Sequence, residues 1–239
     1  MLENPADHKS LKSKNLKDQL LTGIFTYVLP SSLVWQVKTD EKIVYLTFDD
    51  GPIPDLTDQI LKILADYNAK ATFFCVGENV VRNSLIYNNI LEKGHATGNH
   101  SHKHLKGWST NHADYLDDIK EAGKFIDSGL FRPPYGLMTY RQAKALIKDY
   151  HVIMWSVLTK DYDPDVSKEE CLKIALEGIR PGSIIVFHDN VKAREKVLYA
   201  LPRLLEHLKN EGYRSERLEF IKPSSQNTAA FYSEPYKSC

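Results

Sequence analysis

The segment Ile43-Val44-Tyr45-Leu46-Thr47-Phe48-Asp49-Asp50-Gly51-Pro52 ends an apolar run with two neighbouring carboxylates. Side chains of neighbouring strand residues point to opposite faces, so Asp49 and Asp50 can share one site only where the strand ends. Gly51 and Pro52 are typical of the turn that such an ending requires. Two adjacent carboxylates repel each other unless a positive charge compensates them. The segment therefore predicts a cation, or a basic side chain, at the end of a buried strand.

Histidines that could complete a metal site follow in the segment Asn99 to Leu105. His100 and His104 are four positions apart, so a helix or a tight loop can direct both imidazoles to one point. One aspartate and two histidines leave open coordination positions, as a hydrolytic Zn²⁺ site or a non-haem iron site requires. Each motif alone is most often a surface feature. Their joint occurrence, each after a predicted strand, favours a metal site.

The composition is that of an ordinary globular domain. The chain has 239 residues, of which 42% are hydrophobic and 26% are charged, and its formal net charge is zero. Nothing in this balance indicates nucleic acid or an anionic membrane as a partner. Three cysteines without paired spacing predict neither a disulfide framework nor a cysteine metal site.

Three regions are predicted along the chain. Residues 1–41 are expected to be an extension packed on or preceding the domain, residues 42–221 the domain itself, and residues 222–239 a tail. Leu20 to Leu29 resembles a weak signal peptide, but Pro30 interrupts it and no small-residue cleavage site follows. A packed extension is therefore favoured, and the expected location leans to the cytoplasm. No apolar run reaches the length of a membrane span, and the sequence predicts no oligomeric state.

From residue 43 onward, short apolar runs alternate with longer segments of helical period. The predicted strands are residues 43–48, 71–76, 95–98, 130–132, 152–157 and 184–187. Repeated strand–helix units predict a parallel sheet, either doubly wound or closed into a barrel. Polar residues follow the predicted strands, and in a barrel such positions converge on one rim. This placement favours a distorted (β/α)7-type barrel that resembles a TIM barrel.

Over roughly residues 42 to 220, the chain resembles the polysaccharide deacetylase (NodB homology) family, carbohydrate esterase family 4. The resemblance rests on five segments: Thr47 to Pro52, His100 to His104, Arg132-Pro133-Pro134-Tyr135, Trp155 to Tyr162, and Val186-Phe187-His188. The fourth segment departs from the family, whose usual pattern is Asp, two variable residues, Asp and Trp. Here it reads Leu158-Thr159-Lys160-Asp161-Tyr162, which retains the second acid and an aromatic residue.

The resemblance implies a metal-dependent hydrolase that removes acetyl groups from N-acetylated sugars of a polysaccharide or glycan, of chitin-oligomer or peptidoglycan type. It assigns the metal to Asp50, His100 and His104. The expected ion is Zn²⁺, with Co²⁺ or other divalent ions as alternatives, because two imidazoles and a carboxylate suit several metals. The expected partner is an acetylated glycan.

The same resemblance implies roles for the remaining residues. Asp49 would be the catalytic base, and Arg132 would steady it. His188 would be the catalytic acid, aligned by Asp161. The Tyr135 backbone amide would assist the oxyanion. Substrate contacts are expected from four residues: Pro134, Tyr135, Trp155 and Tyr162.

Three other functions are open at this point. An amidase of the same fold could act on a non-sugar amide, and no single position excludes it. The altered fourth segment suggests a catalytically silent carbohydrate-binding member, although all proposed catalytic positions are filled. A non-haem iron oxygenase could use the same ligand types, but its usual triad has His-x-Asp spacing on an antiparallel jelly roll, which this chain lacks.

Overall fold

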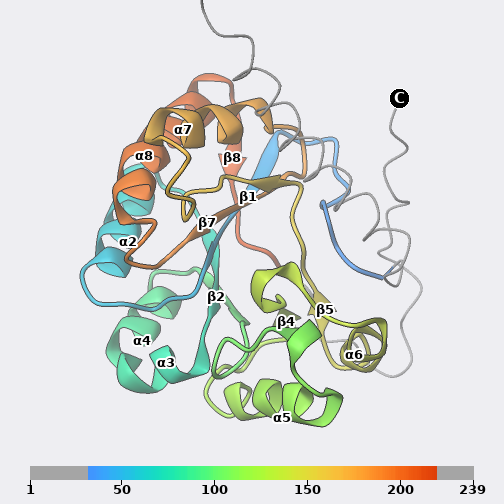
Figure 1. The fold of residues 1–239 in the computed structure, drawn as a ribbon. Helices are drawn as coiled ribbons and strands as arrows, with labels where there is room; N and C mark the ends of the chain where they lie inside the picture. The colour runs from blue at the N-terminus through green and yellow to red at the C-terminus, as the bar shows by residue number, and fades with distance from the viewer. Residues whose placement is uncertain (1–31, 220–239) are drawn as a thin grey trace, which may run out of the picture.

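A curved sheet of parallel strands lies at the centre of the computed structural model, which describes residues 32–219 (Figure 1). The strands are β1 Ile43–Asp49, β2 Ala71–Cys75, β3 Ala96–Asn99, β4 Leu130–Phe131, β5 His151–Val152, β6 Val157–Leu158, β7 Ile184–His188 and β8 Arg214–Ser215. The α-helices are α2 Leu56–Asp66, α3 Gly77–Arg82, α4 Ser84–Glu92, α5 His112–Ala122, α6 Tyr140–Leu146, α7 Lys168–Glu177 and α8 Arg194–Asn210. Two short 3₁₀ turns are η1 Gly107–Ser109 and η2 Pro134–Gly136.

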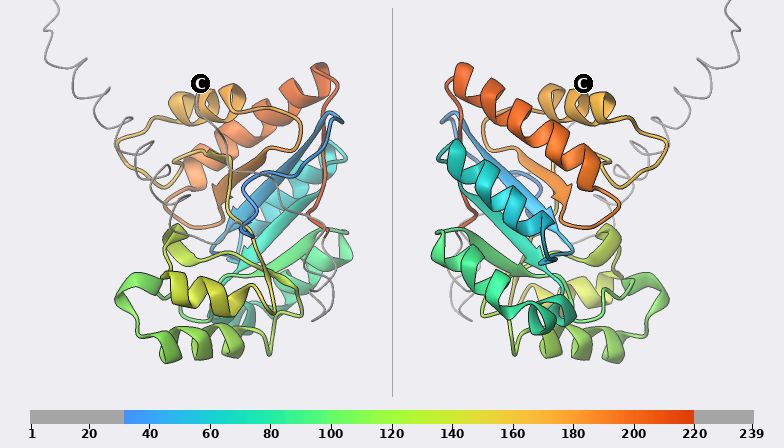
Figure 2. Two further views of the ribbon diagram at one scale, coloured as in Figure 1. Left: turned by 90° about the vertical axis from the view of Figure 1, so that its right-hand side faces the viewer. Right: turned by 90° about the vertical axis from the view of Figure 1, so that its left-hand side faces the viewer.

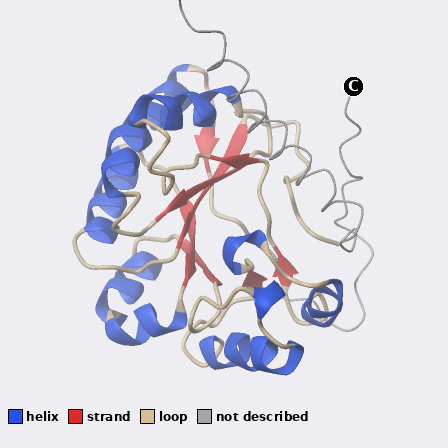
Figure 3. Cartoon of the chain, viewed as in Figure 1, coloured by secondary structure: helices blue, strands red, loops and turns tan. Residues whose placement is uncertain are grey.

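The strand order confirms the predicted distorted (β/α)7-type barrel. Seven strands lie side by side in the order β5-β4-β3-β2-β1-β7-β6, and β8 pairs with the start of β1. The helices form an outer layer around the strands (Figures 2 and 3). Parallel strands need such crossover helices, because each connection must return the chain to the same end of the sheet.

The predicted strand 152–157 differs from the structure, where it is divided into β5 and β6. β5 pairs with β4, and β6 pairs with β7 at the other end of the series. The intervening residues carry the chain from one end to the other. Met154 donates its backbone N–H to Val34 (2.7 Å), and Ser156 donates to Ile184 (3.1 Å). A continuous apolar run therefore hides a change of partner strand that its composition cannot reveal.

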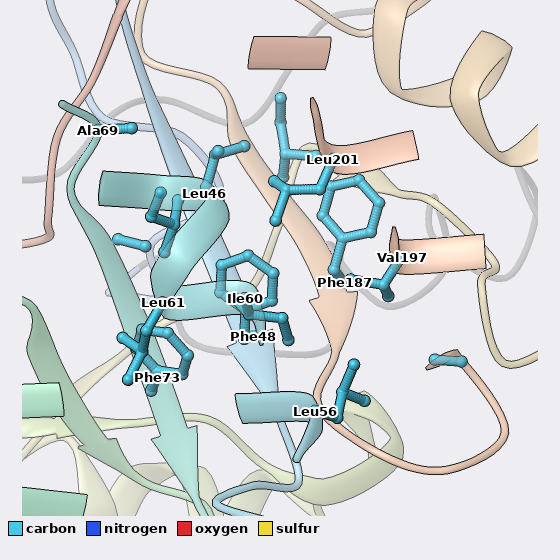
Figure 4. Close-up of a cluster of buried hydrophobic side chains, with 14 of the residues drawn as sticks. Leu46, Phe48, Leu56, Ile60, Leu61, Ala69, Phe73, Phe187, Val197 and Leu201 are labelled. Atoms are coloured by element: carbon cyan, nitrogen blue, oxygen red, sulfur yellow. The ribbon is translucent and has the colours of Figure 1, made fainter. Parts of the chain in front are cut away.

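Side chains along β1 point alternately into the main core and toward the site. Leu46 and Phe48 belong to a buried cluster with residues of α2, α8 and β7 (Figure 4). The Phe48 ring stacks on those of Phe73 and Phe187, with centroids 5.0 and 6.0 Å away. Full burial of such a side chain contributes roughly 1.5–3 kcal/mol. Because neighbours alternate, Asp49 faces the inner side of the barrel while Phe48 faces the helices.

Part of the predicted N-terminal extension lies against the barrel. Leu33 is buried, and Val34 forms a parallel bridge with Ile153. Leu20 to Leu29 and residues 222–239 lie outside the described residues, so the domain limits stay a prediction. Within residues 32–219, no helix combines the length and apolar character needed to span a bilayer.

Candidate active site

Strand register brings the predicted site residues to one edge of the sheet. Asp49, the last residue of β1, is in register with His188, the last residue of β7. The last residues of β3 and β4 are also paired. His100 and Arg132 directly follow those two strands and so lie on the same rim. Residues far apart in sequence thus meet, as expected for the carboxyl ends of parallel barrel strands.

The predicted metal ligands converge directly beyond the end of β1. Asp50 adopts a left-handed φ of 82°, which turns its carboxylate toward the His100–His104 loop. Its Oδ1 lies 3.1 Å from His104 Nε2 and 3.5 Å from His100 Nε2. Nitrogen and oxygen donors of the three residues all lie within 4.8 Å of one another. The histidine segment is a tight loop with left-handed Ser101 and His104, so a loop and not a helix brings the two imidazoles together.

The electrostatics of Asp50 fit a bound cation. Its Oδ1 is buried and has no aligned hydrogen-bond donor among the described residues. Burial alone would raise the pKa of Asp50, but contact with the His100 and His104 imidazoles holds it well below its usual range. His100 Nδ1 lies 2.8 Å from the Arg132 carbonyl oxygen. Since that carbonyl can only accept, Nδ1 carries the proton and Nε2 keeps a lone pair for a metal. One carboxylate and two imidazoles are a donor set that divalent metals take.

Arg132 is fully buried, and its guanidinium is surrounded by acceptors. Nη1 donates to Asp49 Oδ1 (2.7 Å) and to Thr47 Oγ1 (2.8 Å). Nε and Nη2 donate to the carbonyl oxygens of Ile153 (3.2 Å) and Met154 (2.9 Å). These carbonyls belong to the segment between β5 and β6. Arg132 therefore holds Asp49 and also ties that segment to β1 inside the barrel.

A second charged pair lies across the rim. His188 Nδ1 is 2.7 Å from Asp161 Oδ1, and its backbone N–H donates to Asp161 Oδ2 (2.6 Å). Burial alone would lower the pKa of His188, but the charge and hydrogen bond of Asp161 raise it to about 9. Lys160 is left-handed (φ 57°) and turns the chain directly before Asp161. Tyr162 meets the His188 ring edge-on, with centroids 4.8 Å apart.

A cavity of about 690 Å³ joins these groups. Asp49, the three predicted metal ligands and His188 line it together with aromatic and apolar residues of the barrel mouth: Val76, Tyr135, Trp155, Leu158, Tyr162 and Val186. Tyr135 and Tyr162 are exposed, and Trp155 is half-buried. Pro134 is buried and is not among the residues that line the cavity. Of the predicted substrate contacts, the structure thus brings the three aromatic residues to the site.

Two polar contacts of the site were not predicted. Thr47 accepts from Arg132, and its position two residues before Asp49 could have indicated an inward side chain. Asn190 donates to Asp50 Oδ2 (2.6 Å) from the loop after β7. Its only sequence signal is its place two residues after His188. Loop conformation decides whether such a residue reaches the site, and the sequence alone does not give that conformation.

Comparisons with known proteins agree on one family. A profile described as polysaccharide deacetylase matches residues 36–152. The chain is 34% identical over 191 residues to a peptidoglycan-N-acetylglucosamine deacetylase of Bacillus cereus, covering 76% of this chain and 89% of that protein. It is 30% identical over 193 residues to a chitooligosaccharide deacetylase of Bradyrhizobium sp., covering 71% and 86%. A crystal structure of a peptidoglycan N-acetylglucosamine deacetylase with 4-naphthalen-1-yl-N-oxidanyl-benzamide superposes with a TM-score of 0.74, at 30% identity, over 78% and 91%.

Proposed function

Because the chain belongs to the polysaccharide deacetylase family, we propose that it is a metal-dependent hydrolase that removes acetyl groups from N-acetylated sugars of a glycan. The observation that carries the proposal is the shared cavity of Asp49, the Asp50–His100–His104 cluster and His188. The substrate class, of peptidoglycan or chito-oligomer type, is supported by the activities named for the similar proteins.

Asp50, His100 and His104 would hold the metal, and Zn²⁺ is the ion we propose. When bound, such an ion supplies Lewis acidity, which polarises a carbonyl and brings the pKa of water from about 16 toward neutrality. His100 is prepared for this role, because its Nδ1–H is engaged by the Arg132 carbonyl. Asp50 is prepared as well, since one oxygen faces the imidazoles while the other is held by Asn190.

Proton transfers would fall to Asp49 and His188. Asp49 Oδ1 is engaged by Arg132, which leaves Oδ2 to accept a proton from the attacking water. His188 Nδ1 is engaged by Asp161, which leaves Nε2 to protonate the departing amine. With a pKa raised to about 9, His188 carries the proton at neutral pH, as a general acid must. A backbone donor such as the Tyr135 N–H would assist the oxyanion, a contribution of about 3 kcal/mol for comparable donors.

Two substitutions test these roles separately. Asp49→Asn removes the base without touching a metal ligand, so acetate release should be lost while Zn²⁺ binding is retained. His100→Ala removes a ligand, so Zn²⁺ occupancy should fall. Acetate is measured on acetylated chito-oligomers, peptidoglycan fragments and small amides, and zinc by elemental analysis. Parent-level deacetylation by both variants would refute the assignment. Turnover of small amides alone would indicate the amidase, and glycan binding without acetate release the silent member.

A further inference from the structure

The loop between β7 and α8 reaches across the rim to the metal cluster through Asn190. Its Nδ2 lies 2.6 Å from Asp50 Oδ2, and its Oδ1 accepts the backbone N–H of Ala193 (3.0 Å). A carbonyl oxygen is the only part of the amide that can accept that N–H, so the NH₂ group necessarily faces Asp50. The orientation of this amide is therefore determined by its own loop.

The two oxygens of Asp50 have different surroundings. Oδ2 receives the Asn190 amide, whereas Oδ1 is buried and faces the Nε2 atoms of His100 and His104. The backbone of Asp50 is held separately: its N–H donates to Phe74 (3.1 Å), and its carbonyl accepts from Asn79 (2.8 Å). Backbone contacts fix the Cα position but leave the carboxylate free to rotate about its side-chain torsions. Within residues 32–219, the side chain that donates to Oδ2 is Asn190.

We propose that Asn190 is a positioning residue that fixes the Asp50 carboxylate, so that a single oxygen is presented to the metal beside the two imidazoles. The inference rests on the proposed metal site. The β7–α8 loop, which begins directly after His188, would then also hold the aspartate ligand in the geometry that binds the ion. Groups that hydrogen-bond to metal ligands typically change metal affinity 10–100-fold when they are removed.

The decisive variant is Asn190→Ala, with Asn83→Ala as its matched control. Asn83 is also a half-buried asparagine, and its Nδ2 donates to the loop that follows Asp50, but to the backbone carbonyl of Pro52 (3.0 Å). The dissociation constant for Zn²⁺ is measured without substrate by competition with a chelator, and the melting temperature of each metal-free protein is recorded. Asn190→Ala should weaken Zn²⁺ binding about 10–100-fold. Asn83→Ala should bind Zn²⁺ like the parent.

A second variant separates the contact to Asp50 from the contact to Ala193. Asn190→Ser keeps a short oxygen that can accept the Ala193 N–H, but its side chain is too short to reach Asp50. We expect it to bind Zn²⁺ as weakly as Asn190→Ala. Parent-like affinity in either variant would refute the role of Asn190 while leaving the metal site intact. If the parent itself fails to bind Zn²⁺, the proposed metal site is refuted, and the role of Asn190 with it.

Discussion

Replacing Arg132 with methionine should destabilise the fold chiefly by leaving Asp49 as a buried charge without a partner. Asp49 is almost fully buried, and its Oδ1 lies 2.7 Å from the guanidinium. Removing one partner of a buried ion pair typically costs about 3–5 kcal/mol. The variant also leaves the carbonyls of Ile153 and Met154 without donors, at roughly 1 kcal/mol each, so the total cost should be about 5–7 kcal/mol. For a domain of this size, where 1 kcal/mol corresponds to about 2–4 °C, the melting temperature should fall by roughly 10–28 °C.

A double-mutant cycle with Asp49→Asn shows whether the ion pair is the cause. Asparagine keeps the shape of the side chain and an oxygen that can accept from Arg132, but it carries no charge. Arg132→Met should therefore cost about 1–3 kcal/mol less in the Asp49→Asn background than in the parent. Urea unfolding of all four proteins in EDTA provides the free energies without a contribution from bound metal. An equal cost in both backgrounds would refute the reasoning and would reduce Arg132 to a packing and backbone-bonding residue.

Three further expectations concern groups around the same cavity. Asp161→Asn should bring the pKa of His188 below about 9, because burial is then opposed only by the charges of Asp49 and Asp50. NMR titration of the metal-free protein measures this pKa, and the alkaline limb of activity should move to lower pH. Burial raises the pKa of Asp189 to about 7 from 3.8, so the folded state holds a proton that the unfolded state releases. As pH rises from about 4 to about 7, the metal-free parent should therefore lose roughly 4 kcal/mol of unfolding free energy relative to Asp189→Asn. If the unfolding free energies of the two proteins change equally with pH, this expectation is wrong. Gly136→Ala should lower stability by about 1–3 kcal/mol, because φ is +67° and the new Cβ would lie 2.5 Å from the Trp155 ring. Thermal unfolding measures this, and an unchanged melting temperature would show that the Trp155 ring can move without strain.

Much of the site could be predicted because it lies at the ends of strands. The alternation of β1 predicts that Asp49 points inward when Phe48 points to the helices, and a turn is then needed for Asp50 to join it. The left-handed φ of Asp50 is that turn. The parallel register of β1 and β7 then places His188 beside Asp49. Residues that follow strands directly are predictable because one geometric rule positions them all.

Two features of the structure could not be predicted from the sequence: the contact of Asn190 with Asp50 and the division of the predicted strand 152–157. Asn190 reaches Asp50 because its loop folds back on itself through Ala193, and nothing in the composition of the loop encodes that path. The division of the predicted strand 152–157 is similar, since Met154 changes its partner to Val34 while its apolar character continues. In the loop the deciding feature is the path of the backbone, and in the strand it is a contact with a distant segment; the apolar and polar pattern reports neither.

The altered fourth segment contains one position within a strand, Leu158, and one beyond the strand, Asp161, and only the first departs from the family pattern. Leu158 is still in a strand, pairs in register with Val186 and lines the cavity, so its replacement of the usual aspartate makes that part of the wall apolar. Asp161 lies beyond the strand, after the left-handed Lys160. Its carboxylate still binds both Nδ1 and the backbone N–H of His188. The change therefore acts on the surface that meets the substrate and leaves the orientation of His188 intact. This separation is why we expect the departure from the family pattern to alter substrate preference while deacetylation itself is retained.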